Sequence, residues 1–295
     1  MSLLGMDVGG THVTCAVVEP GPTGLCAGPT RRTEVDSSAG AEEILGALAQ
    51  AVRDSVDPRT IDALGIAMPG PFDYPRGISL IKGVAKYEAL YGMDVGAALR
   101  ARLALRAEQH IVFENDANAY VLGEWLAGAA RGGRRVIGMT LGTGFGSGFL
   151  ADGCIVNAGE GLPPDTTLGF VPCRGGIAED FISRRGICKS FRDLGGDPEH
   201  DVADIAEAAR AGDACAARVF AEVGALLGEV LRPFVASFRC DVIVIGGAIS
   251  RAFDLFRDPF AATLNADVKV AISELRDTAA LLGAAELARR SAPSH

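Results

Sequence analysis

Three polar residues, Glu114, Asn115 and Asp116, separate two apolar segments of this chain. The residues before them, HIVF, have the composition of a buried strand, and the residues after them, ANAYVLGEW, predict a helix. A carboxylate at a strand end can take the proton of a hydroxyl group as that oxygen attacks another atom. Asp116 is therefore a candidate general base, although an Asp here is also a common helix N-cap. We expect a structural role for Glu114.

Glycine turns that can bind phosphate follow apolar strands at three places. Glycines let backbone N–H groups face an anion, and a carboxylate such as Asp7 can hold hydrated Mg²⁺ beside it. The second turn, LGTGFGSG, lacks both the helix of a dinucleotide fingerprint and the lysine of a Walker A loop. Each turn alone is ordinary in an α/β protein, but three in this order favour phosphate binding. The residues are Asp7, Gly9, Gly10, Thr11, Gly142, Thr143, Gly144, Gly246 and Gly247.

The elements around these turns predict an α/β protein. The first two turns join two strands and the third joins a strand to a helix, which indicates an internal duplication of one α/β unit. The chain of 295 residues is long enough for two domains. Apolar residues at helical spacing predict helices over residues 39–56, 92–105, 120–130 and 278–290, and residues 177–232 have a mostly helical pattern.

Composition and charge argue against several classes of protein. The net charge is −9 and no long basic run occurs, which argues against nucleic acid as a partner. The seven cysteines include no C-x-x-C pair, so reduced thiols are favoured over a disulfide framework. No apolar run is long enough to span a bilayer, and the chain does not begin with a signal-peptide pattern. We therefore expect a cytoplasmic protein with no membrane partner.

The chain resembles the ROK family of sugar kinases, repressors and open-reading-frame proteins in five motifs, spread over residues 3–250 in the family's order: GMDVGGTHVTCAVV, PGP, ENDANAYVLGEW, GMTLGTGFGSGFLADG and VIVIGGAIS. The resemblance implies two ribonuclease-H-like domains of the actin-like ATPase superfamily, with a cleft between them. The first would hold residues 1–115 and the C-terminal helix at about 277–292, and the second residues 116–276.

The resemblance also implies an activity and roles for residues. The expected protein is a glucokinase-like, ATP-dependent kinase that uses Mg²⁺ and phosphorylates the primary 6-hydroxyl of a hexose, a modified hexose or a cyclitol. Asp116 would be the catalytic base, and Asn115 and Gly70 would bind the acceptor. The glycine turns would bind the phosphates of ATP, and Asp7 would hold Mg²⁺ through water. Family members are commonly dimers, so we expect a homodimer.

The chain departs from the family where most members have G-E-x-G-H followed by C-x-C-G-x-x-G-C-L-E, because it reads TTLGFVPCRGGIAEDF. Thr167 aligns with the Glu and Phe170 with the His, and only Cys173 remains near the shortened loop. A structural zinc needs about four N or S ligands, so we predict no zinc site. Glu179 aligns with the closing Glu and is expected, like Thr167, to contact the acceptor. An alternative alignment uses Glu160 as the first Glu.

These departures bear on which acceptor is used. Polar sites built for a hydroxyl group discriminate strongly, and Thr167 and Phe170 would form a less polar wall. We therefore expect a modified hexose, an amino sugar or a cyclitol rather than plain glucose. Lys82, Gly83 and Lys86 stand where the family often carries a sugar-contacting Asn. Each lysine either contacts an electronegative substituent or is simply solvated.

Three other functions stay open at this point. A ROK repressor would need a DNA-binding domain before the first motif, which begins at residue 3. A non-catalytic sugar-binding protein would be favoured by loss of Asp116, which is present. A kinase that uses polyphosphate would be favoured by extra basic residues near the donor turns, and none stands out.

Overall fold

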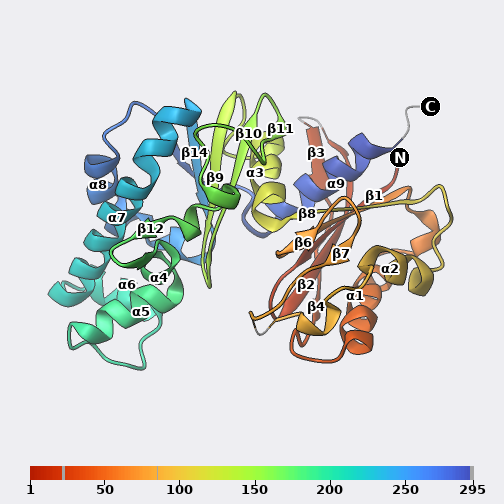
Figure 1. Cartoon of the computed structure of the whole chain (residues 1–295), viewed down its shortest axis with the longest axis horizontal. Coiled ribbons are helices and arrows are strands. Elements are labelled where there is room, and N and C mark those ends of the chain that lie inside the picture. The colour runs from red at the N-terminus through yellow and green to blue at the C-terminus, as the bar shows by residue number, and fades with distance from the viewer. Residues whose placement is uncertain (22–23, 85, 293–295) are drawn as a thin grey trace. The chain divides into compact units, whose positions relative to one another are not determined.

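The computed structural model describes residues 1–21, 24–84 and 86–292. The described chain divides into two compact units (Figure 1). The first runs from Met1 to Arg131 and is completed by the segment that begins at Asp277, and the second runs from Gly132 to Arg276. Each unit contains one large sheet with helices packed against it, as the α/β prediction expects. No helix in the described part of the chain is long and apolar enough to cross a membrane.

The first unit is built on a sheet in which β1 is central. β1 pairs antiparallel with β2 and parallel with β5, which in turn pairs parallel with β8. β3 and β4 extend the sheet beyond β2. The strands are β1 (Leu3–Val8), β2 (His12–Gly21), β3 (Gly24–Ala27), β4 (Arg31–Glu34), β5 (Ala63–Met68) and β8 (His110–Asn115).

The two faces of β1 pack against different helices, because successive side chains of a strand point to opposite faces. Leu4, Met6 and Val8 lie in the apolar core formed with α1 (Ala41–Ser55) and α2 (Val95–Leu103). The opposite face, which carries Gly5 and Asp7, is covered by α9 (Ala279–Ser291).

Helix α9 approaches the sheet closely through glycines. A Cβ atom on Gly5 would lie 2.3 Å from the carbonyl oxygen of Leu281, and one on Gly65 would lie 1.9 Å from that of Ala284. A Cβ on Gly123 of α3 (Asp116–Ala127) would lie 1.9 Å from the carbonyl oxygen of Ala279. Helix α3 therefore belongs to the first unit, whereas the family resemblance implied that residues from 116 onward lie in the second domain.

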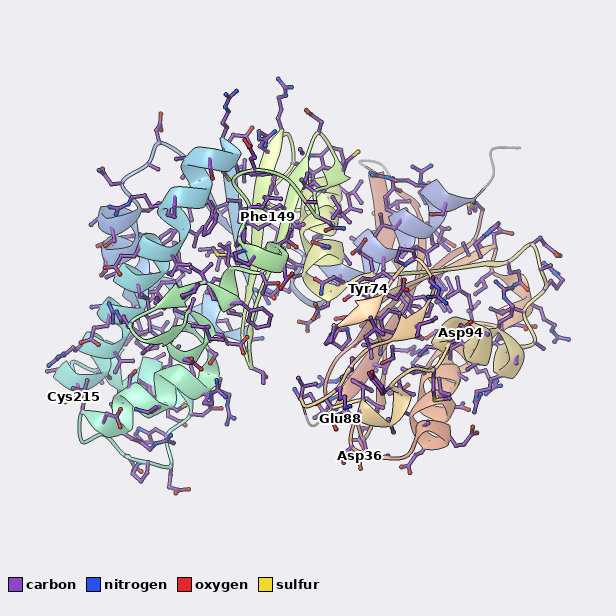
Figure 2. The ribbon with its side chains drawn as sticks, in the orientation of Figure 1. Asp36, Tyr74, Glu88, Asp94, Phe149 and Cys215 are labelled. Carbon is purple, nitrogen blue, oxygen red and sulfur yellow. The ribbon has the colours of Figure 1, made fainter. Side chains whose placement is uncertain are left out.

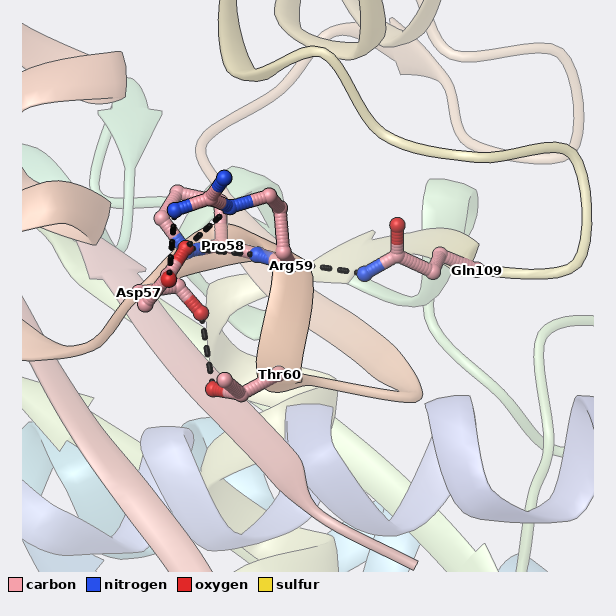
Figure 3. A network of polar contacts seen from close by, with 5 residues as sticks. All are labelled: Asp57, Pro58, Arg59, Thr60 and Gln109. Atoms are coloured by element: carbon pink, nitrogen blue, oxygen red, sulfur yellow. Dashed lines mark hydrogen bonds and ion pairs between the residues drawn. The ribbon is translucent and has the colours of Figure 1, made fainter.

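A polar network fixes the chain just before β8 (Figure 3). The buried side chain of Gln109 donates through Nε2 to the carbonyl oxygens of Pro58 and Ile61, at 2.7 Å each. Asp57 caps the short helix η1 (Pro58–Thr60) by accepting from the N–H of Arg59 at 3.0 Å. These bonds join the loops that precede β5 and β8, two strands that pair in the sheet.

The second unit repeats the strand plan of the first. β9 pairs antiparallel with β10 and parallel with β14, which pairs parallel with β15. The order β10-β9-β14-β15 thus matches β2-β1-β5-β8, as expected for a duplicated α/β unit. The strands are β9 (Arg135–Leu141), β10 (Phe145–Ala151), β11 (Cys154–Ile155), β14 (Val242–Gly246) and β15 (Lys269–Ile272).

The helical region predicted for residues 177–232 is confirmed and consists of several helices. The long helix α7 packs closely against α8 and against the apolar residues of the sheet. The helices are α4 (Glu179–Ile182), α5 (Arg184–Asp193), α6 (Val202–Arg210), α7 (Ala214–Phe238) and α8 (Phe253–Leu264). Short hairpins, β6 (Phe72–Asp73) with β7 (Ile78–Ser79) and β12 (Pro172–Cys173) with β13 (Gly176–Ile177), complete the strands.

Candidate active site

The candidate residues of the first unit gather at one edge of its sheet. Asp7 of β1 lies in register with Ala67 of β5, which lies in register with Glu114 of β8. Because these strands are parallel, their carboxyl ends share this edge. The first glycine turn follows β1, Gly70 follows β5, and Asn115 and Asp116 stand where β8 meets α3.

Asn115, rather than Asp116, is the N-cap of α3. Its Oδ1 accepts from the N–H groups of Ala117 at 3.0 Å and Asn118 at 3.3 Å, and its backbone is extended, with φ −60° and ψ 140°. Asp116 is the first helical residue, and its Oδ1 accepts from the N–H of Ala117 at 2.9 Å. The N-cap alternative for Asp116 is therefore wrong, because the preceding residue takes that role.

The neighbouring side chains hold Asn115 and the start of α3 in place. Asn115 Nδ2 donates to Tyr74 Oη at 3.2 Å, and Tyr74 Oη donates to the carbonyl oxygen of Met68 at 3.2 Å. Glu114 accepts from the Asn115 N–H at 2.9 Å and from Asn118 Nδ2 at 3.0 Å, which agrees with its expected structural role. Within the described residues, one Nδ2 hydrogen of Asn115 has no protein acceptor.

Carboxyl groups converge at this edge. Burial raises the pKa of Asp116 above its usual value. Burial, followed by the charges of Asp116 and Asp277, raises the pKa of Asp7 to about 7. Such mutual repulsion is relieved by a cation, and carboxylate oxygens are ligands that Mg²⁺ prefers. The donor chemistry at Asp7 thus fits a hydrated Mg²⁺.

The first glycine turn has free backbone donors. The N–H of Gly9 donates to the carbonyl oxygen of His12 at 2.9 Å. Within the described residues, the N–H groups of Gly10 and Thr11 donate to no protein acceptor. The Thr11 hydroxyl shares a hydrogen bond of 2.8 Å with His12 Nδ1. Adjacent unpaired N–H groups form a concavity suited to an anion.

The two glycine turns of the second unit lie together. Gly246, at the end of β14, is in register with Thr140 of β9, so both strands end at one edge. Gly247 has φ 81°, and a Cβ there would lie 2.2 Å from the carbonyl oxygen of Leu141. This close approach requires glycine and places the turn beside the one that starts at Gly142.

The turn between β9 and β10 also presents free donors. The N–H of Gly142 donates to the carbonyl oxygen of Gly144 at 3.0 Å, which closes the turn. In the part of the chain that the structure describes, the N–H groups of Thr143 and Gly144 have no protein acceptor. The second turn therefore has the same feature as the first, two neighbouring N–H groups that face no protein oxygen.

Glu179 lies against this second turn. Its Oε2 accepts from the N–H of Phe145 at 2.8 Å, and a Cβ on Gly144 would lie 2.8 Å from the same oxygen. The side chain therefore supports the turn, and among the described residues its other oxygen accepts no hydrogen bond. Glu160, the residue of the alternative alignment, is exposed in the loop after β11.

The loop around Thr167 is tied to β10 by a buried serine. The Ser147 hydroxyl accepts from the N–H of Leu168 at 2.8 Å and donates to the carbonyl oxygen of Thr166 at 3.1 Å. Thr167 donates through its hydroxyl to the carbonyl oxygen of Asp165 at 3.1 Å. Phe170 is 51% exposed, so an apolar ring faces solvent near Thr167.

Sequence reasoning missed two tyrosines that support the first unit's residues. Tyr74, labelled in Figure 2, orients Asn115, and the buried Tyr87 donates to the carbonyl oxygen of Gly9. Tyr74 could have been predicted, because it follows the PGP motif closely in the sequence. No motif in the sequence indicates a role for Tyr87. Among the described residues, no three His, Cys, Asp or Glu side chains are grouped as metal ligands.

Comparison with known proteins gives consistent matches along the chain. Residues 3–291 match the model of the ROK family. The chain is 27% identical to the glucokinase of Thermotoga maritima, with 97% of both chains covered. It is 26% identical to the glucokinase of Streptomyces coelicolor, with 98% of both covered. A solved ROK family glucokinase from Streptomyces griseus, in complex with glucose and AMPPNP, has a TM-score of 0.80 at 25% identity, covering 99% of this chain and 100% of that chain.

Proposed function

Because this chain belongs to the ROK family, as its motifs predicted, we propose that it is an ATP-dependent carbohydrate kinase. The α/β fold is also confirmed, since the likeness to the Streptomyces griseus glucokinase extends over almost the whole chain. The observation that carries the activity is Asp116, a carboxyl group at a strand end that has no capping role and few protein partners. Names of the relatives support a sugar as acceptor and ATP as donor.

Asp116 acts in this proposal as the general base. The acceptor hydroxyl oxygen forms the new bond to the γ-phosphorus of ATP, and the bond from that phosphorus to the oxygen of ADP breaks. The hydroxyl proton passes to the Asp116 carboxylate. Asn115 orients the acceptor through its remaining Nδ2 hydrogen, and Gly70, which is exposed after β5, leaves room for the sugar.

The glycine turns bind the donor phosphates in this proposal. The unpaired N–H groups of Gly10 and Thr11, and those of Thr143 and Gly144, supply hydrogen-bond donors to phosphate oxygens. Gly246 and Gly247 lie against the nucleotide. Asp7 is the residue that would hold Mg²⁺ through water, and a bound Mg²⁺ would neutralise phosphate charge.

The acceptor is proposed to differ from plain glucose. Thr167 and Phe170 replace a Glu and a His of the family pattern, and the Thr167 hydroxyl already bonds to Asp165. Glu179 then remains as the charged acceptor ligand from this region. We expect an amino sugar, another modified hexose or a cyclitol with a primary hydroxyl to be used better than glucose.

The decisive experiment measures ADP release with Mg-ATP and a panel of hexoses, amino sugars and cyclitols. We expect one acceptor to give clear turnover, and Asp116→Asn to lower kcat by roughly 10²–10⁴-fold, since that is the usual contribution of a general base. Asp54→Asn, an exposed carboxylate on α1, serves as a matched control and should keep full activity.

Two outcomes would contradict the proposal. Glucose as the best acceptor by kcat/KM would exclude the modified-acceptor assignment. No turnover of any acceptor, with sugar binding still seen by calorimetry, would favour the non-catalytic sugar-binding protein instead.

A further inference from the structure

Lys86 lies directly beside the first glycine turn. A Cβ atom on Gly10 would lie 2.9 Å from Lys86 Nζ and 3.2 Å from Lys86 Cε. The ammonium group therefore occupies the space above a residue whose own N–H has no protein acceptor. The sequence pattern suggested an acceptor contact for Lys86, because relatives carry a sugar-contacting Asn there, whereas in the structure its charge lies beside the first glycine turn.

The next residue holds this part of the chain against the same turn. Tyr87 is buried, and its hydroxyl donates to the carbonyl oxygen of Gly9. Its N–H donates to the carbonyl oxygen of Ser37 at 2.6 Å. Tyr87 also has φ 57°, a left-handed conformation that a bulky residue keeps only when its surroundings enforce it. The backbone that carries Lys86 is thus fixed relative to Gly9 and Gly10.

The Lys86 ammonium is not used by the protein itself. Among the described residues it makes no hydrogen bond or ion pair, and its side chain is exposed. Lys82, on the same segment, differs because its Nζ lies 5.3 Å from the ring centroid of Tyr91. An unpaired cation next to unpaired N–H groups forms a site for an anion with several oxygen atoms.

We propose that Lys86 is a catalytic residue that binds an oxygen of the donor's terminal phosphoryl group at the Gly9–Thr11 turn. This inference rests on the proposed kinase activity and adds a residue to it. Negative charge spreads over the oxygens of the phosphoryl group during transfer, and a fixed cation there stabilises the transition state. Lys86 is a point charge, so arginine should replace it in part and methionine should not.

The test compares Lys86→Met with Lys86→Arg and with the matched control Lys189→Met, which removes an exposed ammonium group of α5 that pairs with Asp193. In steady-state kinetics, Lys86→Met should lower kcat/KM for ATP by roughly 10²-fold, the usual effect of losing one such donor. The KM of the acceptor should change little. Lys86→Arg should recover part of the loss, and Lys189→Met should stay close to the wild type.

A binding measurement separates this role from a structural one. Lys86→Met should weaken binding of AMPPNP, measured by calorimetry, and leave binding of AMP unchanged, because AMP lacks the terminal phosphoryl group. An equal loss of affinity for AMPPNP and AMP would overturn the proposed role of Lys86. Full activity of Lys86→Met, with an active wild type, would also overturn it. An inactive wild type would overturn the kinase assignment instead, while the AMPPNP comparison would still test the phosphate contact.

Discussion

Asp7, the proposed Mg²⁺ ligand, lowers the stability of the folded protein when its carboxyl group is ionised and no cation is bound. Burial and two neighbouring carboxyl groups raise its pKa to about 7, from the ordinary 3.8. Folding therefore favours the protonated form. Ionisation of Asp7 therefore lowers the free energy of unfolding. This loss is absent well below pH 3.8, grows as the pH rises to about 7, and reaches its full size above that. Asp7→Asn should raise the free energy of unfolding by about 4 kcal/mol at pH 8, and by less than half of that at pH 5.

Urea unfolding in EDTA at the two pH values measures this effect. Asp54→Asn is the control, because its carboxyl group is exposed and should give small, similar differences at both pH values. Equal stabilisation by Asp7→Asn at pH 5 and pH 8 would contradict the proposed dependence of stability on the ionisation of Asp7. A loss of stability at pH 8 would mean that the fold needs the ionised carboxylate.

Residues of the candidate site could be predicted from the sequence where they belong to a recognisable motif. The residues at strand ends were found because the turns and the NDAN segment stand out in the sequence, and the structure brings those of each unit to one edge of its sheet. The cap of α3 could not be assigned, because Asn115 and Asp116 both suit that position. Tyr87 and Lys86 could not be related to Gly9 and Gly10, because they lie more than 70 positions further along the chain and only the folded loop brings them together.

At the scale of elements, close packing of α9 on β5 should depend on Gly65. A Cβ there would lie 1.9 Å from the carbonyl oxygen of Ala284, so Gly65→Ala forces the helix backbone away from the sheet. We expect a loss of about 3 kcal/mol in the free energy of unfolding, the upper part of the range for overpacked cores. Gly46→Ala in α1 should instead raise stability by up to about 1 kcal/mol, because no atom lies within 4 Å of that Cβ and alanine favours helices.

Chemical denaturation of the two alanine variants beside the wild type decides this prediction. Both variants add one methyl group to a glycine, so the comparison isolates the space around it. Wild-type stability of Gly65→Ala would mean that α9 can shift without loss of packing. A destabilised Gly46→Ala would point to a backbone requirement in α1 that the structure does not show.

Helices and strands were largely predictable, but their grouping was not. Periodicity identified α1, α2, α9 and the two hairpins that frame the glycine turns. The assignment of α3 to the first unit depends on Gly123 and Gly283 meeting the backbone of the opposite helix. No pattern along the sequence distinguishes such glycines from those of a loop, so the helix pair could only be seen in the structure.

At the scale of the whole molecule, the first unit depends on both ends of the chain. A chain that ends after Leu275 would lack α9 and leave the face of β1 and β5 with Gly5 and Gly65 uncovered. Hydrogen exchange should then show loss of amide protection in strands β1, β5 and β8. The second unit lacks no element in this chain, so its strands β9, β10 and β14 should keep their protection. A chain that ends after Ala292 is the control and should match the full chain. Retained protection of β1 and β5 without α9 would show that the remaining helices of the first unit are enough to stabilise its sheet. Loss of protection in both units would show that the two units unfold together.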